Sequence, residues 1–418
     1  MTQPVDGYTG LREDRPEMRS YFIVLLISFF TLSNLGFVAA EIDKAPTWTY
    51  STDGPAYSIA ILSDGSHTVA GTQSVNGGTI YYLDKQGNLL WKYGTDRHVW
   101  SVAVSDDGQY IAAAASKYSG IGAGHSYAGL VYLFDNHGNL LWKYDTNQTA
   151  VTEVKLSEDG SFVAVDRTWG ISYLNRNGSI LWIHNNTSIN DHPVRMAKDG
   201  SLVATKDYQT MRVFDRNGTL IWTRTVGPSS AFGFSNDGRY LVTSADPSGI
   251  NMFDREGNLV WANNIDKHFT NLSFSSDGSY IVASAQGWGE GNPGGIFLFD
   301  NHGNILWEHQ QEGSSAISSD GSYVCVGQWI DTGPSVVLFN RNGDLLWQHA
   351  AGIVTSIAIS QNGRYVIAGI VGQTGFNGPG SIQLYTNDMS IPEFPSVFPI
   401  LLIGITSLII FYRMNMIK

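Results

Sequence analysis

The chain has 418 residues, with 25 basic and 37 acidic side chains and a formal net charge of −12 at pH 7. This balance argues against nucleic acid as a partner, because a nucleic-acid-binding surface needs a basic face. The single cysteine, Cys325, excludes an intramolecular disulfide, and its apolar neighbours predict a buried, inert thiol. Glycine and aromatic residues are abundant, as expected for many short strands joined by turns.

The first 40 residues have the layout of an export signal. Three arginines precede the apolar run 21–30, and small residues end at Ala40. This order predicts a secretory signal peptide over residues 1–40, with cleavage after Ala40. The stretch before the apolar run is long for such a leader and includes acidic residues, so an uncleaved N-terminal anchor is the alternative.

The region 41–388 contains eight copies of a hairpin motif. In each copy an apolar strand runs into Asp-Gly or Asn-Gly, and a second apolar strand follows. Asp-Gly between apolar strands is among the strongest sequence indications of an antiparallel hairpin. The turn glycines are Gly65, Gly108, Gly160, Gly200, Gly238, Gly278, Gly321 and Gly363.

A second motif alternates with the first: Asp or Asn, two residues, Gly, three residues and Trp. It predicts a strand, a tight turn at a glycine with positive φ, and a second strand whose Trp is buried where the next repeat packs. Seven copies end at Trp91, Trp142, Trp182, Trp222, Trp261, Trp307 and Trp347. Each repeat therefore has four strands in roughly 43 residues, which is the length of a propeller blade.

The eighth repeat lacks its Trp strand, and a matching strand with Trp48 lies at the other end of the region. Pairing Trp48 with the sheet that contains Leu384 would close the ring and remove its open sheet edges. The sequence thus predicts an all-β, eight-bladed propeller of four-stranded antiparallel blades, closed by the N-terminal strand. A seven-bladed ring with one repeat left over is the alternative.

The two motifs also carry a family resemblance, which covers roughly residues 45–385. Asp-x-x-Gly-x-x-x-Trp resembles the tryptophan-docking motif of pyrroloquinoline-quinone-type propeller repeats, and Ser-x-Asp-Gly-x-Tyr is more similar to WD-type repeats. The resemblance implies a propeller, but some members of the family are dehydrogenases and others are scaffolds without a catalytic site.

Several features argue against an enzyme. The quinone enzymes that the repeats resemble usually carry a disulfide between adjacent cysteines beside the cofactor, which a chain with one cysteine cannot form. The sequence has no phosphate loop, nucleophile elbow or His/Cys/Asp cluster with metal-ligand spacing. We therefore predict no cofactor, no metal and no catalytic residue.

The C-terminal end predicts a membrane anchor. A Pro-rich linker at 389–396 precedes the tail 397–418, whose apolar run 397–412 is slightly under the ~20 residues that a membrane helix needs. Basic residues after the run place the C-terminus in the cytoplasm, so the body would be held on the extracellular face of the membrane. Pro392-Glu393-Phe394-Pro395, the apolar run and the basic end resemble the PEF-CTERM sorting signals of archaeal surface proteins. That resemblance implies removal of the tail by an archaeosortase, and a plain transmembrane helix is the alternative.

The loops of a propeller lie on two faces, because successive strands alternate in direction. The turns of both motifs share one face and vary little in length. The longer loops 117–128, 286–294 and 370–379 share the other, which we call the variable-loop face. Function usually lies on loops held by a rigid scaffold.

Four tryptophans outside the repeat motif map to the variable-loop face: Trp100, Trp169, Trp288 and Trp329. Such rings suit stacking on sugars or anchoring of a protein partner. The alternative is that they cover the blade tops and bind nothing.

The third and fourth repeats carry charges where other repeats have uncharged residues. Lys155 and Arg195 stand where the other six have Ala, Gly or Ser, and Glu153, Asp166-Arg167 and Lys206-Asp207 lie nearby in sequence. Because buried charges are tolerated mainly when paired, an ion-pair seam between neighbouring blades is one interpretation. A polar ligand site at the mouth of the central channel is the other.

Candidate glycosylation sequons for a secreted chain begin at Asn147, Asn177, Asn185, Asn186 and Asn217. Asn177 and Asn217 also precede turn glycines, where Asn suits the turn geometry alone.

Taken together, the sequence predicts an exported, membrane-anchored propeller that serves as a binding or scaffold module on an archaeal cell surface. Its ligand would be a protein or a glycan on the variable-loop face. An extracellular glycan-active hydrolase or lyase and a structural envelope component are the alternatives.

Overall fold

The computed structural model describes residues 43–119, 126–147, 149–186, 193–227, 231–245, 248–287, 293–330, 333–372, 375 and 378–388. The predicted signal peptide, linker and C-terminal tail lie outside these residues, and so does Trp288. Within the described ranges, no helix is long and apolar enough to span a membrane.

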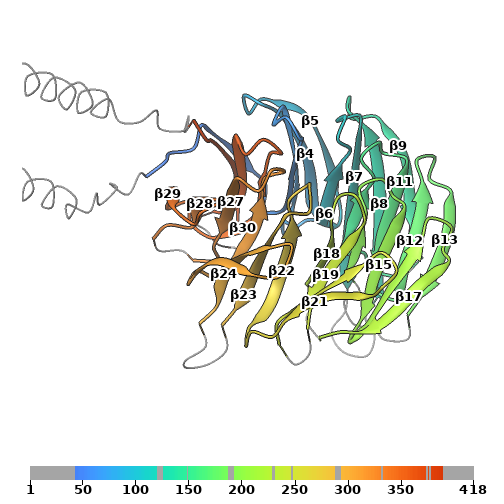
Figure 1. The fold of residues 1–418 in the computed structure, drawn as a ribbon. Coiled ribbons are helices and arrows are strands. Elements are labelled where there is room, and N and C mark those ends of the chain that lie inside the picture. Colours follow the sequence, from blue (N-terminus) through green and yellow to red (C-terminus); the bar gives the residue numbers. More distant parts are fainter. Residues whose placement is uncertain are drawn as a thin grey trace, which may run out of the picture. The chain divides into compact units, whose positions relative to one another are not determined.

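Thirty-two strands within the described ranges form eight four-stranded antiparallel sheets, which are the blades of a propeller (Figure 1). The first four blades consist of β2 (Ala56–Ile61), β3 (His67–Thr72), β4 (Gly78–Asp84) and β5 (Leu89–Thr95); β6 (His98–Val104), β7 (Tyr110–Ser119), β8 (Ser126–Asp135) and β9 (Leu140–Asp145); β10 (Val154–Leu156), β11 (Phe162–Arg167), β12 (Gly170–Asn175) and β13 (Ile180–Asn185); and β14 (Val194–Met196), β15 (Leu202–Asp207), β16 (Thr210–Asp215) and β17 (Leu220–Thr225).

The next three blades consist of β18 (Phe232–Phe234), β19 (Tyr240–Ser244), β20 (Ile250–Asp254) and β21 (Leu259–Asn263); β22 (His268–Phe274), β23 (Tyr280–Gln286), β24 (Gly295–Asp300) and β25 (Ile305–His309); and β26 (Ser314–Ile317), β27 (Tyr323–Gly327), β28 (Val336–Asn340) and β29 (Leu345–His349). The last blade is β1 (Trp48–Thr52), β32 (Gly380–Thr386), β31 (Tyr365–Val371) and β30 (Val354–Ile359), in that order across the sheet.

The ring closes through the strand that the sequence predicts. β1 pairs antiparallel with β32, with Trp48 opposite Leu384 and Thr52 opposite Gly380. The innermost strands pack in sequence from β2 through β6, β10, β14, β18, β22 and β26 to β30, and β30 packs on β2 again. The eight-bladed prediction is therefore confirmed, and the seven-bladed alternative is excluded.

Both turn types are held by side-chain hydrogen bonds that the motif residues supply. In the turn after β4, the Asp84 carboxylate accepts the backbone N–H groups of Gln86 at 2.9 Å and Asn88 at 2.8 Å. Gly87 closes this turn with φ of +84°, a conformation that costs a residue with a Cβ. In the hairpin after β6, Ser105 Oγ donates to Asp107 Oδ1 at 2.6 Å, which fixes the Asp-Gly turn.

Each repeat Trp connects its blade to the next one. The indole N–H of Trp91 donates to the carbonyl of Asn136 at 3.1 Å, and the ring covers Gly138, where an added Cβ would lie 2.7 Å from ring carbon Cγ. The same hydrogen bond to a backbone carbonyl of the next blade recurs for Trp48, Trp142, Trp182, Trp222, Trp261 and Trp307. Trp347 differs, because no described residue accepts its N–H. Its ring still contacts the next blade, with its centroid 5.3 Å from that of Tyr385, as the Trp91 ring contacts Phe134 at 5.4 Å.

All three predicted long loops are shorter than the sequence suggests. Lys117 and Ala128 face each other in the paired strands β7 and β8, which extend as far as Ser119 and Ser126. Ile370 likewise lies in β31, and Gln286 lies in β23. Cross-strand pairing satisfies the backbone of these segments despite their Gly- and Ser-rich composition, so those loop predictions are wrong at their ends.

We expect Gly138→Ala to lower the free energy of unfolding by about 2–4 kcal/mol. The added methyl group would require a left-handed conformation at φ +84° and would collide with the Trp91 ring. Urea unfolding of the full chain, followed by Trp fluorescence, measures the loss. The matched control is Gly94→Ala, because no atom lies within 4 Å of the added Cβ and Gly94 is in strand β5. Equal losses in the two variants would contradict the docking argument.

Candidate functional site

The face that carries the Asp-Gly hairpins is tied together by backbone hydrogen bonds between successive blades. The N–H of Asp106 donates to the carbonyl of Glu158 at 2.8 Å, and the N–H of Glu158 donates to the carbonyl of Lys198 at 2.8 Å. Equivalent bonds run from Ser276 to Ser319, from Ser319 to Gln361 and from Gln361 to Ser63. These bonds draw the hairpin turns together at this end of the channel.

Three cavities follow one another between the inner strands. The outer cavity, of about 600 Å³, is lined by Ser58, Ile59, Trp100, Ser101, Val102, Thr152, Glu153, Lys155, Asp166 and Pro193. The inner cavity, of about 350 Å³, shares Lys155 with it. The hairpin cavity, of about 430 Å³, shares Asn236 with the inner cavity and lies among the Asp-Gly turns. The three cavities are therefore neighbours, with Lys155 between the outer and inner ones and Asn236 between the inner and hairpin ones.

A β-bulge places Trp100 at the outer cavity. The register between β6 and β7 skips between Val99 and Ser101, so Trp100 has no partner in the ladder and its side chain is 41% exposed. Its ring centroid lies 6.5 Å from that of Tyr57, which occupies the same kind of bulge in β2. Bulges of this kind re-aim side chains near binding sites. Burial raises the pKa of Tyr57 above its ordinary value.

One carboxylate, that of Glu153, holds both of the cations that the sequence analysis singled out. Its Oε1 accepts hydrogen bonds from Lys155 Nζ at 2.8 Å and from Arg195 Nη1, and its Oε2 accepts the backbone N–H of Val194 at 3.1 Å. Burial alone would raise the pKa of Glu153, but the charges of Arg195 and Lys155 outweigh it and lower the pKa to about 2. The carboxylate is therefore ionised at neutral pH.

This cluster joins three blades. Glu153 and Lys155 belong to the blade that starts with β10, Arg195 lies on β14, and Arg195 Nε donates to the carbonyl of Phe232 on β18 at 3.1 Å. The contacts expected of an ion-pair seam between neighbouring blades are therefore formed. Lys155 and Arg195 also line the inner cavity, so the arrangement expected of a polar ligand site in the channel is formed as well.

The other charges of the third and fourth blades are buried away from the inner cavity. Asp166 accepts a hydrogen bond from the hydroxyl of Thr152, and Arg167 Nη2 donates to Asn185 Oδ1 at 2.9 Å. Lys206 is only 2% exposed, and burial lowers its pKa to about 8. Asp207 lies 3.9 Å from Arg212 Nη1.

Trp169 and Trp329 do not line the outer cavity with Trp100. Trp169 is 44% exposed in the turn between β11 and β12. Trp329 is 56% exposed and lines a separate cavity of about 350 Å³ with Thr270, Gln286 and Glu312 among others. The Glu312 carboxylate accepts the N–H groups of Gly287 at 3.1 Å and Gly294 at 3.2 Å, which ties the two ends of one loop together.

Tyr57, the neighbour of Trp100, is not among the site residues predicted from the sequence. Both residues lie eight positions before a hairpin glycine, Gly65 for Tyr57 and Gly108 for Trp100, so an alignment of the repeats would have found the pair.

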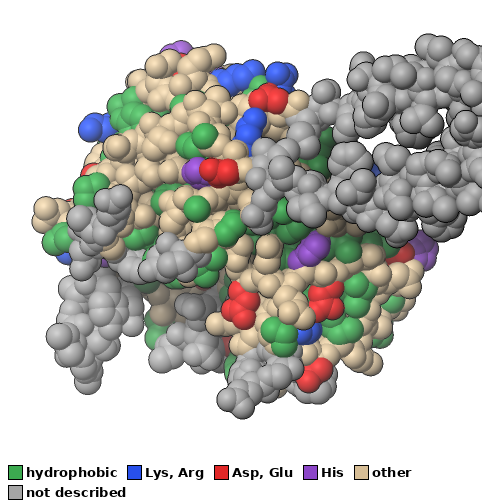
Figure 2. All heavy atoms as spheres, turned by 90° about the vertical axis from the view of Figure 1, so that its left-hand side faces the viewer, with side chains coloured by type: hydrophobic (Ala, Val, Ile, Leu, Met, Phe, Trp, Pro, Cys, Tyr) green, Lys and Arg blue, Asp and Glu red, His purple; other side chains and the backbone are tan. Residues whose placement is uncertain are grey.

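The candidate glycosylation asparagines differ in their exposure to solvent. Asn147, Asn177, Asn185 and Asn217 are exposed, whereas Asn186 is only 9% exposed. On the described part of the side shown in Figure 2, hydrophobic side chains are scattered among polar and charged ones.

Cys325 is buried as predicted, and burial raises the pKa of its thiol to about 12. In the part of the chain that the structure covers, no three His, Cys, Asp or Glu side chains are grouped to hold a metal ion.

We expect Glu153→Gln to destabilise the fold by about 2–4 kcal/mol at pH 7, because two cations would lose their shared carboxylate. A carboxyl group with a lowered pKa contributes stability above its unfolded pKa and loses it as the pH falls through the folded value. The difference from the wild type should therefore shrink between about pH 4.5 and about pH 2, the ordinary and folded pKa values of Glu153.

Urea unfolding at a series of pH values measures this difference. The control is Asp96→Asn, which removes an exposed carboxylate 2.5 Å from Arg97 and should cost less than about 1 kcal/mol. A deficit of Glu153→Gln that stays constant down to pH 2 would contradict the assignment.

Comparison with solved structures supports the fold. The Sqt1 protein of Chaetomium thermophilum bound to the N-terminus of ribosomal protein L10 is 13% identical, with a TM-score of 0.61, over 80% of this chain and 98% of that one. Sqt1 without that segment has a TM-score of 0.63 and 12% identity, over 82% of this chain and 98% of that one. BamB from Moraxella catarrhalis is 16% identical, with a TM-score of 0.60, over 84% of this chain and 99% of that one.

No curated protein matches the sequence of the chain. A family model does match it, over residues 76–212 and 207–378, which together cover well over half of the chain. The family bears the name PQQ_2 and the description outer membrane protein assembly factor BamB. The chain belongs to this family.

Proposed function

We propose that the propeller is a protein-binding scaffold and that its partner docks at the outer cavity on the variable-loop face. The observation that carries the proposal is the placement of Trp100. A bulge projects this ring, 41% exposed, at a cavity of about 600 Å³ that also contains the Glu153–Lys155 ion pair. An exposed aromatic ring next to a concave polar site is the composition of a binding hot spot.

The surroundings of Trp100 favour an extended protein segment as the ligand. Tyr57 and His98 flank the ring, with centroids 6.5 Å and 6.3 Å from it, and supply further aromatic contact area at the rim. Tryptophan, tyrosine and arginine are the residues that most often dominate protein–protein binding energy. Lys155 lines the outer cavity and, together with Arg195, the neighbouring inner cavity, so one segment at the outer cavity would contact both the aromatic rim and Lys155.

The similar proteins support this class of function. Sqt1 was solved bound to the N-terminus of ribosomal protein L10, which shows that a propeller similar in fold binds a segment of another protein. The family to which the chain belongs takes its description from an assembly factor.

The cellular setting is part of the proposal and rests on the sequence. The export signal over residues 1–40 and the apolar tail 397–418 support a propeller that is displayed outside the cell and anchored at its C-terminal end. The resemblance to PEF-CTERM signals supports an archaeal surface. A glycan partner is the competing assignment, for which the exposed ring of Trp329 above its own cavity is the relevant feature.

We expect Trp100→Ala to weaken partner binding at least tenfold, because a buried aromatic anchor contributes about 2 kcal/mol or more. The full chain, immobilised in a membrane mimic, would retain the partner from an extract of the cell envelope. Isothermal titration with the purified partner then compares the variants. Leu306→Ala is the control, because Leu306 is 46% exposed on β25, the outermost strand of its blade.

Unchanged affinity in Trp100→Ala would overturn the proposed docking site. Retained material that resists protease, and that is lost in Trp329→Ala, would instead assign a glycan to the second cavity.

A further inference from the structure

We propose that the inner cavity binds a carboxylate of an acidic peptide segment that enters through the outer cavity. This inference rests on the proposed function and adds the chemistry of the partner: Asp or Glu side chains in an extended segment.

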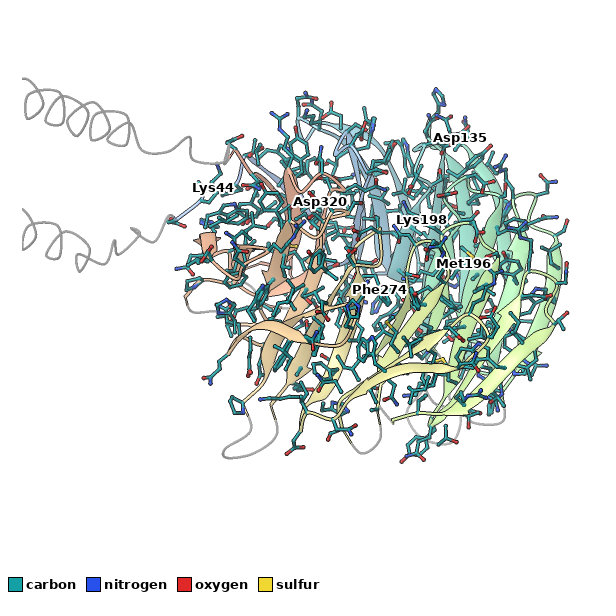
Figure 3. The ribbon with its side chains drawn as sticks, viewed as in Figure 1. Lys44, Asp135, Met196, Lys198, Phe274 and Asp320 are labelled. Atoms are coloured by element: carbon teal, nitrogen blue, oxygen red, sulfur yellow. The ribbon has the colours of Figure 1, made fainter. Side chains whose placement is uncertain are left out.

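The inner cavity is cationic on one side only. Lys155 and Arg195 occupy the same repeat position on the adjacent strands β10 and β14, where the other six blades have Ala, Gly or Ser. The rest of the lining is Met196, Gly233, Phe234, Asn236, Asn271, Leu272, Ser273, Phe274 and Ser315, without a carboxylate among these residues. Figure 3 labels Met196 and Phe274, which lie among the inner strands.

Both cations keep unused hydrogen-bond donors. An ammonium group has three N–H donors, and Lys155 Nζ makes one described hydrogen bond, to Glu153. Arg195 uses Nε for the Phe232 carbonyl and Nη1 for Glu153 and the Val194 carbonyl, while no described residue accepts from Nη2. The two side chains are 36% and 29% exposed, so a ligand can reach them.

Another part of the cavity wall supplies neutral polar partners. Asn271 and Ser273 lie on β22 and line the same cavity as the two cations. An amide N–H and a hydroxyl can each donate to the second oxygen of a carboxylate whose first oxygen is held by Lys155 or Arg195. Charge-assisted hydrogen bonds of this kind are roughly twice as strong as neutral ones.

Among the three described cavities, the charged lining residues favour an anion in the inner one, because the outer cavity is lined by Glu153 and Asp166 against Lys155. Glu153 is one carboxylate shared by two cations, which leaves a positive excess beside the inner cavity. The hairpin cavity has the reverse balance, with Asp106, Glu158, Asp199 and Asp237 against Lys198. The net charge of −12 on the whole chain does not override this, because salt screens charges beyond about 10 Å.

The route to the cavity also favours a peptide. Backbone hydrogen bonds tie successive hairpin turns together, and the outer cavity, of about 600 Å³, is larger than the hairpin cavity, of about 430 Å³, so the proposal places the entrance at the outer cavity. A segment that crosses it passes Trp100 at the rim before it reaches Lys155, which lines both cavities. One acidic side chain in the inner cavity and one apolar group on Trp100 would use both features.

The test titrates the full chain in a membrane mimic with a tetraglutamate peptide that has blocked ends. The comparison ligands are the matching tetraglutamine peptide and inorganic phosphate. We expect tetraglutamate to bind at least tenfold more tightly than tetraglutamine, and its affinity to fall as salt is raised. Lys155→Met and Arg195→Gln should each weaken tetraglutamate binding at least tenfold. Lys143→Met, on the exposed outer strand β9, should bind as the wild type does.

Equal binding of the two peptides by the wild type would overturn the inference, and so would unchanged tetraglutamate binding in Lys155→Met. Tight phosphate binding that is lost in the same two variants would overturn the peptide assignment in favour of a small anion. If Arg195→Gln fails to fold, the wild-type comparison and Lys155→Met still decide. Loss of the native partner in Trp100→Ala is a separate result, so the failure of this inference does not imply failure of the proposed function.

Discussion

The contact between an aromatic ring of one blade and a bare turn glycine of the next organises the whole ring. Trp91 covers Gly138, and in the other turn series Tyr110 covers Gly160, where an added Cβ would lie 2.4 Å from ring carbon Cδ2. The guanidinium of Arg176 lies 4.5 Å from the centre of the Tyr110 ring and covers it from solvent. The core of each blade is therefore complete only when the next blade packs on it. A blade at an open end of the ring would lack this contact, so closure of the ring stabilises the fold.

The ring is closed within one blade, which combines β1 with β30, β31 and β32, and this blade departs from the repeat pattern of the others. Because β1 comes from the other end of the region, no repeat turn follows β32 to receive Trp347 as Asn136 receives Trp91. Trp347 keeps only the ring contact with the third strand of the next blade, here Tyr385, which Trp91 makes with Phe134. Two polar contacts flank the joint: an ion pair between Lys44 and Asp388 at 3.2 Å, and a hydrogen bond between His349 Nδ1 and Asp43 Oδ1 at 2.7 Å. The missing turn contact is therefore replaced by sheet pairing and by contacts around the joint.

The fold was predictable from sequence because each blade repeats two turns whose residues act locally. An Asp that bonds the backbone two and four residues later, or a glycine with positive φ, needs no distant partner. The extents of β7 and β8 were not predictable, because Lys117 and Ala128 are in strands only through their pairing with each other. At the site, the unusual positions of Lys155 and Arg195 were visible in the repeat, but their common partner Glu153 depends on how two blades pack.

The energetics of the cluster formed by Glu153, Lys155 and Arg195 indicate why the chain carries these charges. Burying part of an ion pair has a desolvation cost that offsets its Coulomb gain, and Glu153, at 18% exposed, is the least exposed member of this cluster. Replacement of buried ion pairs by well-packed apolar residues is often neutral or stabilising. Six blades of this ring pack with Ala, Gly or Ser at the position of Lys155 and Arg195, so the architecture does not require charge there. Small residues at both positions would also remove the need for Glu153. The cluster is better explained by what it offers to the channel, namely donors beyond those that Glu153 accepts, than by the stability of the seam.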